Sequence, residues 1–191
     1  MLRVMLVDDS HEEESPLKEG LVAAGYDVVV VSALGLALAE RVTELAPDVI
    51  IIDTESPSRD VLEHVSVVNA RAPRPIVVFT DDRENASIQA ALKAGVSAYV
   101  VAGIDAQRLQ PILEVAVARF QHEQALREEL RDAQTKLVER KTIERAKGIL
   151  MEQKGVSEEH AYRLLRKLAM DRNAKLLDVA QQVVDVAKLL S

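Results

Sequence analysis

Hydrophobic and polar residues follow a regular order along the first hundred positions. Short runs rich in Val, Ile and Leu predict five strands, at about residues 3–7, 28–31, 48–52, 75–79 and 98–101. Apolar residues at helical spacing predict four helices between them, at about 15–24, 34–45, 59–70 and 84–94. Five strand-then-helix units predict an α/β fold: a doubly wound (βα)5 domain with a parallel sheet and helices on both faces.

After residue 105 the pattern is helical throughout. Asp105 is expected to cap the last helix of the first domain, and Pro111 is expected to kink or restart that helix. Between 120 and 140 most residues are polar or charged, but four apolar ones recur at spacings of 4, 3 and 4: Leu126, Leu130, Ala133 and Leu137. This heptad-like stripe predicts a helical, coiled-coil-like linker that pairs with its copy in a homodimer. A solvated helix in a monomer is the alternative.

The last fifty residues predict three short helices, at about 141–153, 158–169 and 174–189. Gly155 is expected to end the first of them, and Ser157 and Asn173 to cap the next two. Gly148 lies inside the first helix, where a close approach by a neighbouring helix would explain it. Helices this short cannot bury their apolar faces alone. They are therefore expected to form a small all-α bundle with its core at 141–190.

Several polar residues stand where predicted strands end. Asp8 and Asp9 follow the first strand, Asp53 the third and Thr80 the fourth. The carboxyl ends of parallel strands share one edge of the sheet, where ligands bind. Three carboxylates gathered there repel one another unless a cation joins them, and oxygen ligands suit Mg²⁺. We therefore predict a Mg²⁺ site formed by Asp8, Asp9 and Asp53.

These residues and their order resemble a response-regulator receiver domain over residues 1–119. The resemblance implies that Asp8 and Asp9 bind metal with Asp53, that Asp53 is the phosphoacceptor, and that Thr80 and Tyr99 form the receiver switch. One position departs from the family, because Ala102 stands where receivers carry a lysine. A lysine about 4 Å from the phosphoryl group would contribute roughly 4 kcal/mol at an effective dielectric of 20. Asp53 is therefore expected to be an atypical phosphoacceptor.

Three blocks in the C-terminal region resemble the ANTAR family. They are Ile143 to Met151, the run from Glu159 through Ala161, Tyr162, Leu165 and Arg166, and the run from Asn173 through Lys175, Leu176, Val179 and Ala180. The resemblance covers about residues 127–188. It implies a three-helix RNA-binding module and transcription antitermination, by binding RNA hairpins in leader transcripts that compete with or precede terminators.

Cations provide candidate RNA contacts in this region. Arg163, Arg166 and Lys167 lie opposite the apolar stripe of the helix at 158–169. The expected RNA-binding set adds cations from the neighbouring helices and one aromatic side chain that could stack on an unpaired base: Arg145, Lys147, Lys175 and Tyr162. The ordinary alternative is a small structural or dimerisation bundle whose charged side chains are simply solvated.

Charge divides the chain of 191 residues. Residues 1–134 carry a net charge of −11 and residues 135–191 carry +4, which together give −7. An acidic front and a basic tail fit a regulatory domain joined to an anion-binding one. No apolar run approaches the roughly 20 residues of a membrane span, and no signal peptide is visible, so a cytoplasmic protein is expected. There is no cysteine and no visible nucleophile–base pair, so an enzyme is not expected.

We therefore expect an RNA-binding antiterminator: an atypical receiver at 1–119, a linker at 120–140 and an ANTAR domain at 127–188. Among such regulators the chain looks most like the NasT type of nitrate assimilation, which a nitrate- or nitrite-sensing partner protein of the NasS type holds inactive. Two other classes stay open. One is a phosphorylation-controlled DNA-binding response regulator that uses 158–169 and 174–189 as a helix-turn-helix. The other is a protein-interaction adaptor without nucleic acid.

Overall fold

The computed structural model describes residues 2–8, 16–31, 38–101 and 106–190. It divides into two compact units, residues 1–124 and residues 125–191. The expectations for Asp9, Ala102 and Asp105 concern residues outside the described ranges. No helix among the described residues is long and apolar enough to cross a membrane.

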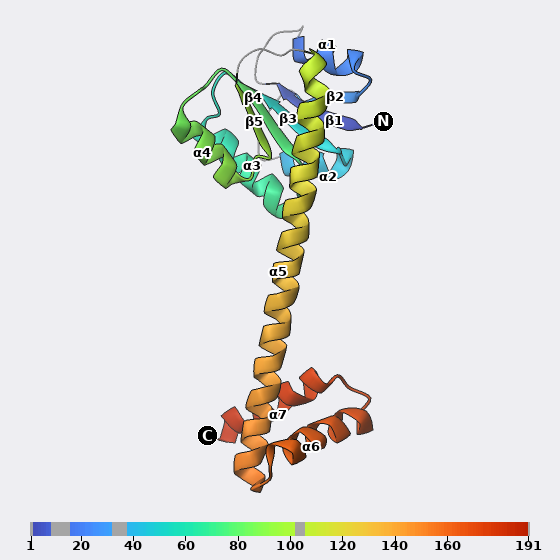
Figure 1. The fold of residues 1–191 in the computed structure, drawn as a ribbon, viewed down its shortest axis with the longest axis vertical. Coiled ribbons are helices and arrows are strands. Elements are labelled where there is room, and N and C mark those ends of the chain that lie inside the picture. The colour runs from blue at the N-terminus through green and yellow to red at the C-terminus, as the bar shows by residue number, and fades with distance from the viewer. Residues whose placement is uncertain (1, 9–15, 32–37, 102–105, 191) are drawn as a thin grey trace. The chain divides into compact units, whose positions relative to one another are not determined.

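The first unit is a five-stranded parallel sheet with helices on both sides (Figure 1). Its strands are β1 (Arg3–Asp8), β2 (Asp27–Val31), β3 (Val49–Asp53), β4 (Ile76–Thr80) and β5 (Ala98–Val101). Its helices are α1 (Pro16–Ala23), α2 (Leu38–Leu45), α3 (Arg59–Arg71), α4 (Asn85–Ala94) and the beginning of α5 (Ala106–Lys154). The strand order is β2-β1-β3-β4-β5, so the predicted α/β fold is confirmed.

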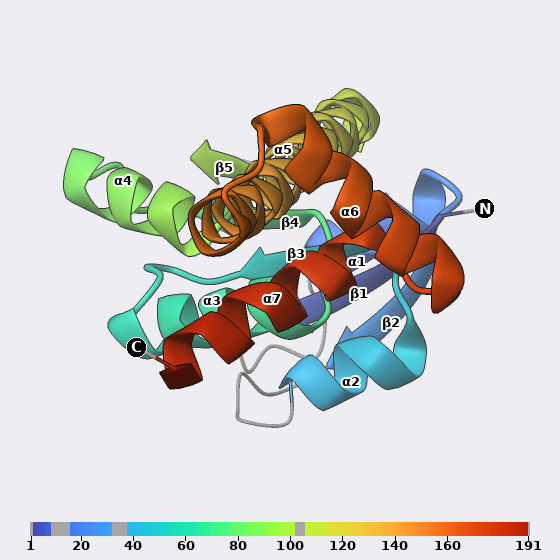
Figure 2. The ribbon, with the colours of Figure 1, turned by 90° about the horizontal axis from the view of Figure 1, so that it is seen from below.

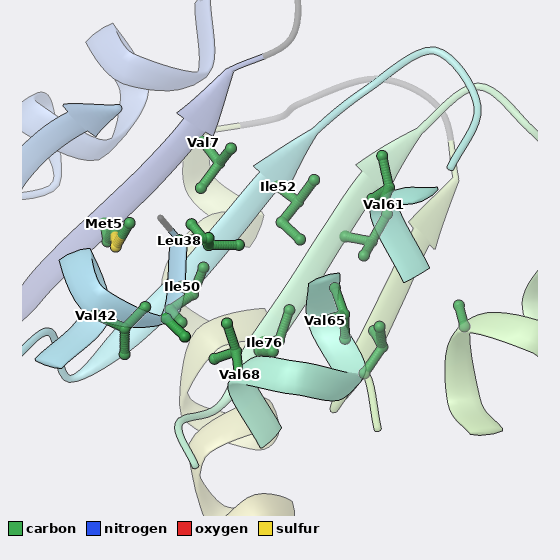
Figure 3. Close-up of a cluster of buried hydrophobic side chains, with 14 residues drawn as sticks. Met5, Val7, Leu38, Val42, Ile50, Ile52, Val61, Val65, Val68 and Ile76 are labelled. Carbon is green, nitrogen blue, oxygen red and sulfur yellow. The ribbon is translucent and has the colours of Figure 1, made fainter. Parts of the chain in front are cut away.

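Alternate residues of each central strand enter two separate cores, because successive side chains point to opposite faces. One core contains Met5 and Ile50 and is covered by α2 and α3, as Figure 3 shows. The other contains Leu6 and Ile51 and is covered by α1 and by the beginning of α5, through Leu113. Both faces of β1, β3 and β4 are therefore buried, which explains why their sequences are almost wholly apolar.

Helix α3 is fastened to the end of α4 by one side chain. The Asn69 amide Nδ2 donates to the carbonyl oxygens of Ala94 and Gly95, at 3.0 Å each. Gly95 has φ +98°, and a Cβ added there would overlap the Asn69 amide. Both the backbone conformation and the lack of a side chain are therefore required of Gly95.

Helix α5 is one continuous helix of 49 residues. The expected break at Pro111 does not occur, since the helix runs through it. Proline near a helix start removes one hydrogen bond but leaves the turns after it intact. Residues 112–147 contain neither Gly nor Pro and are rich in strong helix formers. The expected helix at 141–153 is accordingly the C-terminal part of α5.

The second unit packs α6 (Glu158–Asp171) and α7 (Leu176–Leu190) against the end of α5 (Figures 1 and 2). The three helices share a core that includes Ala146, Leu165 and Ala180. The Ser157 hydroxyl accepts a hydrogen bond from the backbone N–H of His160 at 3.4 Å, which confirms the predicted cap.

Two expectations for this unit are wrong. Asn173 does not cap α7; its backbone is left-handed, with φ +49°, and the next N–H, from Ala174, donates to Ala169 at 2.9 Å. Asn173 therefore ends α6, a role that asparagine shares with glycine. Gly148 has no close neighbour, because an added Cβ would meet nothing within 4 Å. Gly155, by contrast, has φ +61° and ends α5 as expected.

Candidate functional sites

Acidic side chains gather at the carboxyl edge of the sheet. Asp8 of β1 and Asp53 of β3 are direct neighbours in the strand register. The strand order reverses between β1 and β3, and ligands of such sheets bind at this switch point. Asp81 follows β4. Burial and repulsion by Asp8 and Asp81 raise the pKa of Asp53 from 3.8 to about 6. The pocket therefore disfavours a further negative charge unless a cation accompanies it.

Thr80 and Tyr99 are brought together by hydrogen bonds through the β4–α4 loop. The buried Thr80 hydroxyl donates to the carbonyl of Glu55 at 2.7 Å and accepts from the backbone N–H of Asp82 at 3.2 Å. The Tyr99 hydroxyl donates to the carbonyl of Asp82 at 3.2 Å. Burial and the nearby charge of Asp82 raise the pKa of Tyr99. Movement of either side chain must therefore break a hydrogen bond to the Asp82 backbone.

The Asp82 carboxylate joins two loops. It accepts from the Ser56 hydroxyl at 2.8 Å and from the backbone N–H of Glu84 at 2.8 Å. Hydrogen bonds from Glu84, Ser87 and Ser56 lower the pKa of Asp82. The loop after β3, which follows Asp53, is thus tied to the loop after β4.

Asp81, Asp82 and Ser56 are not among the residues expected from the sequence. The sequence does contain a signal for the two aspartates, because they directly follow Thr80 at the end of a strand. Asp8 has the corresponding position at the end of β1. The Ser56 contact has no such signal, since it joins two loops 26 residues apart.

The predicted metal set is described only in part. Asp8 and Asp53 lie side by side, whereas Asp9 is outside the described residues. Within the described ranges, no group of three His, Cys, Asp or Glu side chains has an arrangement that could hold a metal ion. Asp8 and Asp81 nevertheless repel the charge of Asp53, and a divalent cation beside Asp53 would relieve that repulsion.

Most of the expected RNA-binding residues are exposed on the second unit. Arg163, Arg166 and Lys167 are exposed on α6, opposite the buried Ala161 and Leu165. The remaining exposed members are Tyr162 on α6, Arg145 on α5 and Lys175 just before α7. The α6 surface of Arg163, Arg166 and Lys167 is called the α6 cationic surface below.

Lys147 does not belong to such a surface. Its Nζ lies 2.8 Å from a Glu144 carboxylate oxygen and 2.7 Å from one of Glu158, and only 9% of its side chain is exposed. These two carboxylates raise the pKa of Lys147, and Lys147 in turn lowers that of Glu158. The ammonium therefore joins α5 to the first turn of α6, and the structure does not leave it available to RNA.

A groove of about 530 Å³ lies between α5 and α7. Its lining is mixed: Ile149, Val184 and Ala187 are apolar, Arg145 and Lys188 are cationic, and Glu152 and Gln153 are acidic and polar. Lys188 is not among the residues expected from the sequence. Its position opposite Arg145 depends on how α7 packs on α5, which no local pattern encodes.

The middle of α5 exposes apolar side chains. Leu126, Leu130 and Leu137 are 52%, 59% and 53% exposed. Ala133, the fourth member of the stripe, is exposed as well. The stripe that the sequence predicts is therefore an exposed apolar surface in the single chain.

A parallel sheet in this strand order, with acidic residues at its carboxyl edge, is the architecture of signal receiver domains. Residues 4–114 match the response regulator receiver domain, and residues 131–184 match the ANTAR domain. The transcriptional regulatory protein PdtaR of Mycobacterium tuberculosis strain H37Rv is 32% identical over 183 residues, which cover 96% of this chain and 89% of that protein. The chain belongs to the response regulators that combine a receiver domain with an ANTAR domain.

Other similarities are shorter. The nitrate regulatory protein of Klebsiella oxytoca is 40% identical over 85 residues, which cover 44% of this chain and 22% of that protein. Among solved structures, the signal receiver domain of a modulated diguanylate cyclase from Desulfovibrio desulfuricans G20 superposes with a TM-score of 0.56. It is 23% identical and covers 64% of this chain and 98% of that one, a likeness that supports the fold alone.

Proposed function

We propose that this response regulator is a cytoplasmic antiterminator whose C-terminal unit binds hairpins in leader RNA. The observation that carries the proposal is the α6 cationic surface within an ANTAR domain. Arg163, Arg166 and Lys167 stand on the solvent side of a helix whose other side is fixed in a core. Cations held in this way contact phosphates without reorganising the fold.

The groove between α5 and α7 offers a second contact. Its apolar side chains, among them Ile149 and Val184, would contact the face of an unpaired loop base, and Arg145 and Lys188 would meet the flanking phosphates. Sequence-specific RNA recognition usually uses such unstacked bases. Tyr162, which is 42% exposed on α6, provides an alternative surface for stacking.

The test is a titration with a leader RNA that contains two hairpins. If about four phosphates are contacted, log affinity should fall with log salt at a slope of roughly −3. Arg166→Ala with Lys167→Ala should weaken binding and reduce that slope, and Arg145→Ala tests the groove separately. Arg71→Ala, an exposed cation on α3, is the matched control. Unchanged affinity in the α6 variant, or tighter binding to duplex DNA than to hairpins, would contradict the proposal.

Two chains are proposed to pair through the exposed stripe of α5, so that two ANTAR domains meet two hairpins. Linked sites gain avidity without any new contact. Leu130→Asp should reduce the dimer content in sedimentation and weaken binding to paired hairpins more than to a single hairpin. A variant as dimeric as the parent protein would assign the stripe another role.

Control is proposed to come from a sensor protein rather than from phosphate. The residue that supports this is Ala102, where receivers place a lysine. Without that cation the phosphorylated state loses a contact that distinguishes it from the resting state, and a ligand shifts an equilibrium only by its differential affinity. A partner that binds the inactive form acts by mass action. The proposed partner is a nitrate- or nitrite-sensing protein of the NasS type; the short similarity to a nitrate regulatory protein supports the link to nitrate but not the partner itself.

Mg²⁺ is proposed to bind at Asp8, Asp9 and Asp53, where it would offset the repulsion that raises the pKa of Asp53. If the partner sets the switch, Asp53→Asn should leave regulated antitermination nearly unchanged in cells. Loss of induction in that variant, with the protein folded and abundant, would instead support an ordinary phosphorelay.

A further inference from the structure

We propose that the two α5 helices pair antiparallel, with the centre of the pair between Arg131 and Asp132. This inference rests on the pairing through α5 proposed above and adds the direction of the partner. The heptad places Leu130 and Leu137 at a positions and Leu126 and Ala133 at d positions. All four are exposed, so a second copy of this helix can reach the whole stripe.

The apolar layers fit the antiparallel arrangement. In that arrangement an a position faces a d position of the partner, so Leu130 meets the partner's Ala133 and Leu126 meets the partner's Leu137. Each large side chain next to the centre then faces a small one. In a parallel pair Ala133 would face the partner's Ala133 and leave a thin layer beside the Leu130 layer, which costs packing contacts.

The charged layers that flank the stripe distinguish antiparallel from parallel pairing more strongly than the apolar layers do. The a position before Leu126 is Glu123, and the d position after Leu137 is Arg140. An antiparallel pair places Glu123 opposite the partner's Arg140, twice. A parallel pair places Glu123 opposite the partner's Glu123 and Arg140 opposite the partner's Arg140. Like charges in contact are destabilising, whereas opposite charges attract.

The e and g positions, which flank the a and d positions, also favour the antiparallel pair. Antiparallel helices bring g positions together, which places Glu129 beside the partner's Lys136, again twice. Parallel helices instead bring each g position to the following e position of the partner, which places Lys136 beside the partner's Lys141. Lys136 is therefore attracted to its neighbour in the antiparallel pair and repelled by its neighbour in the parallel pair.

Charge reversal separates the two directions by the sign of its effect. In the antiparallel pair Lys136→Glu sets two glutamates against each other, and we expect the dimer dissociation constant to rise about three- to tenfold. Adding Glu129→Lys to the same chain should restore pairing. In a parallel pair Lys136→Glu would meet Lys141 and tighten the dimer. Sedimentation equilibrium at low salt measures the dimer dissociation constants of the parent protein, the single variant and the double variant. Tighter pairing of the single variant than of the parent would overturn the proposal.

Disulfide trapping gives an independent measurement, because the chain has no cysteine of its own. In the antiparallel pair the two copies of residue 126 lie about 16 Å apart along the axis, at 1.5 Å per residue, beyond the roughly 7 Å limit for a bridge. Leu126→Cys alone and Leu137→Cys alone should therefore stay uncross-linked. A mixture of the two, one carrying a size tag, should give the mixed dimer. Asp132→Cys, off the stripe, is the control.

Cross-linking of Leu126→Cys with itself would establish a parallel pair and overturn the proposal, and so would the absence of any mixed dimer. RNA titration of the same reduced samples keeps the two proposals apart. A protein that binds hairpins but forms no mixed dimer refutes only the antiparallel pair. A mixed dimer that binds no hairpin refutes only the RNA function.

Discussion

Asp53→Asn is expected to make the protein more stable at neutral pH. The Asp53 carboxyl has a pKa of about 6, raised from 3.8 by burial and by Asp8 and Asp81. Ionising it in the folded state therefore costs free energy that the unfolded chain does not pay. At 1.36 kcal/mol per pH unit the full cost is about 3 kcal/mol. Because water reaches part of the carboxyl and screens it, we expect about 1–2 kcal/mol.

The sign of the pH dependence follows from the raised pKa. Between about pH 4 and pH 6 the folded protein binds more protons at Asp53 than the unfolded chain does, so stability falls as the pH rises through this window. Asparagine cannot ionise. The stabilising effect of Asp53→Asn should therefore be complete above about pH 7 and absent below about pH 4.

Urea unfolding of the parent protein and of Asp53→Asn at pH 7.5 and pH 4 measures this difference. Because both proteins contain the same other carboxyl groups, the contributions of those groups cancel when the two stabilities are subtracted. Millimolar Mg²⁺ should stabilise the parent protein at pH 7.5 more than the variant, if the ion binds at Asp53. A variant less stable than the parent at pH 7.5, or a stability difference independent of pH, would refute the reasoning.

Three further predictions concern stability. Gly95→Ala should lower the free energy of unfolding by about 2–4 kcal/mol, because it adds a steric clash to an unfavourable φ. Gly155→Ala should lower it by only about 1–2 kcal/mol, because the space around the new Cβ is open. Equal losses for the two variants in urea titrations would contradict this prediction. Gly148→Ala should stabilise the protein by about 1 kcal/mol in the same assay. Lys147→Met should lower the urea midpoint at neutral pH without changing the salt dependence of RNA binding. That loss should diminish as the pH falls through the lowered pKa of Glu158.

The sequence predicts the order of elements because each local pattern agrees with the final structure. The apolar runs that become β1, β3 and β4, and the glycines that end α4 and α5, need no tertiary information. Pattern alone could not predict the continuity of α5, since a proline near a helix start gives the same local signal whether the helix restarts or continues.

The candidate sites divide in the same way. Asp8 and Asp53 could be placed together because strand ends share an edge, and the α6 cationic surface follows from helical periodicity. Lys147 could not be separated from the exposed cations, because its partner Glu158 lies on another helix and the spacing within α5 gives no indication of it. The Ser56–Asp82 contact likewise depends on two loops meeting in space.

Because the middle of α5 is exposed in a single chain, hydrogen exchange in this segment reports whether two chains have associated. Its backbone amides are held by bonds within one helix, and opening that helix around Leu130 exposes little additional apolar surface. Its opening free energy is therefore small in a single chain, far below that of the core around Ile51. Hydrogen exchange there should be fast in dilute protein and slow once two helices pack together. Deuterium uptake over residues 121–140 thus measures association directly, while the strands of the sheet in the same sample provide a reference that does not change.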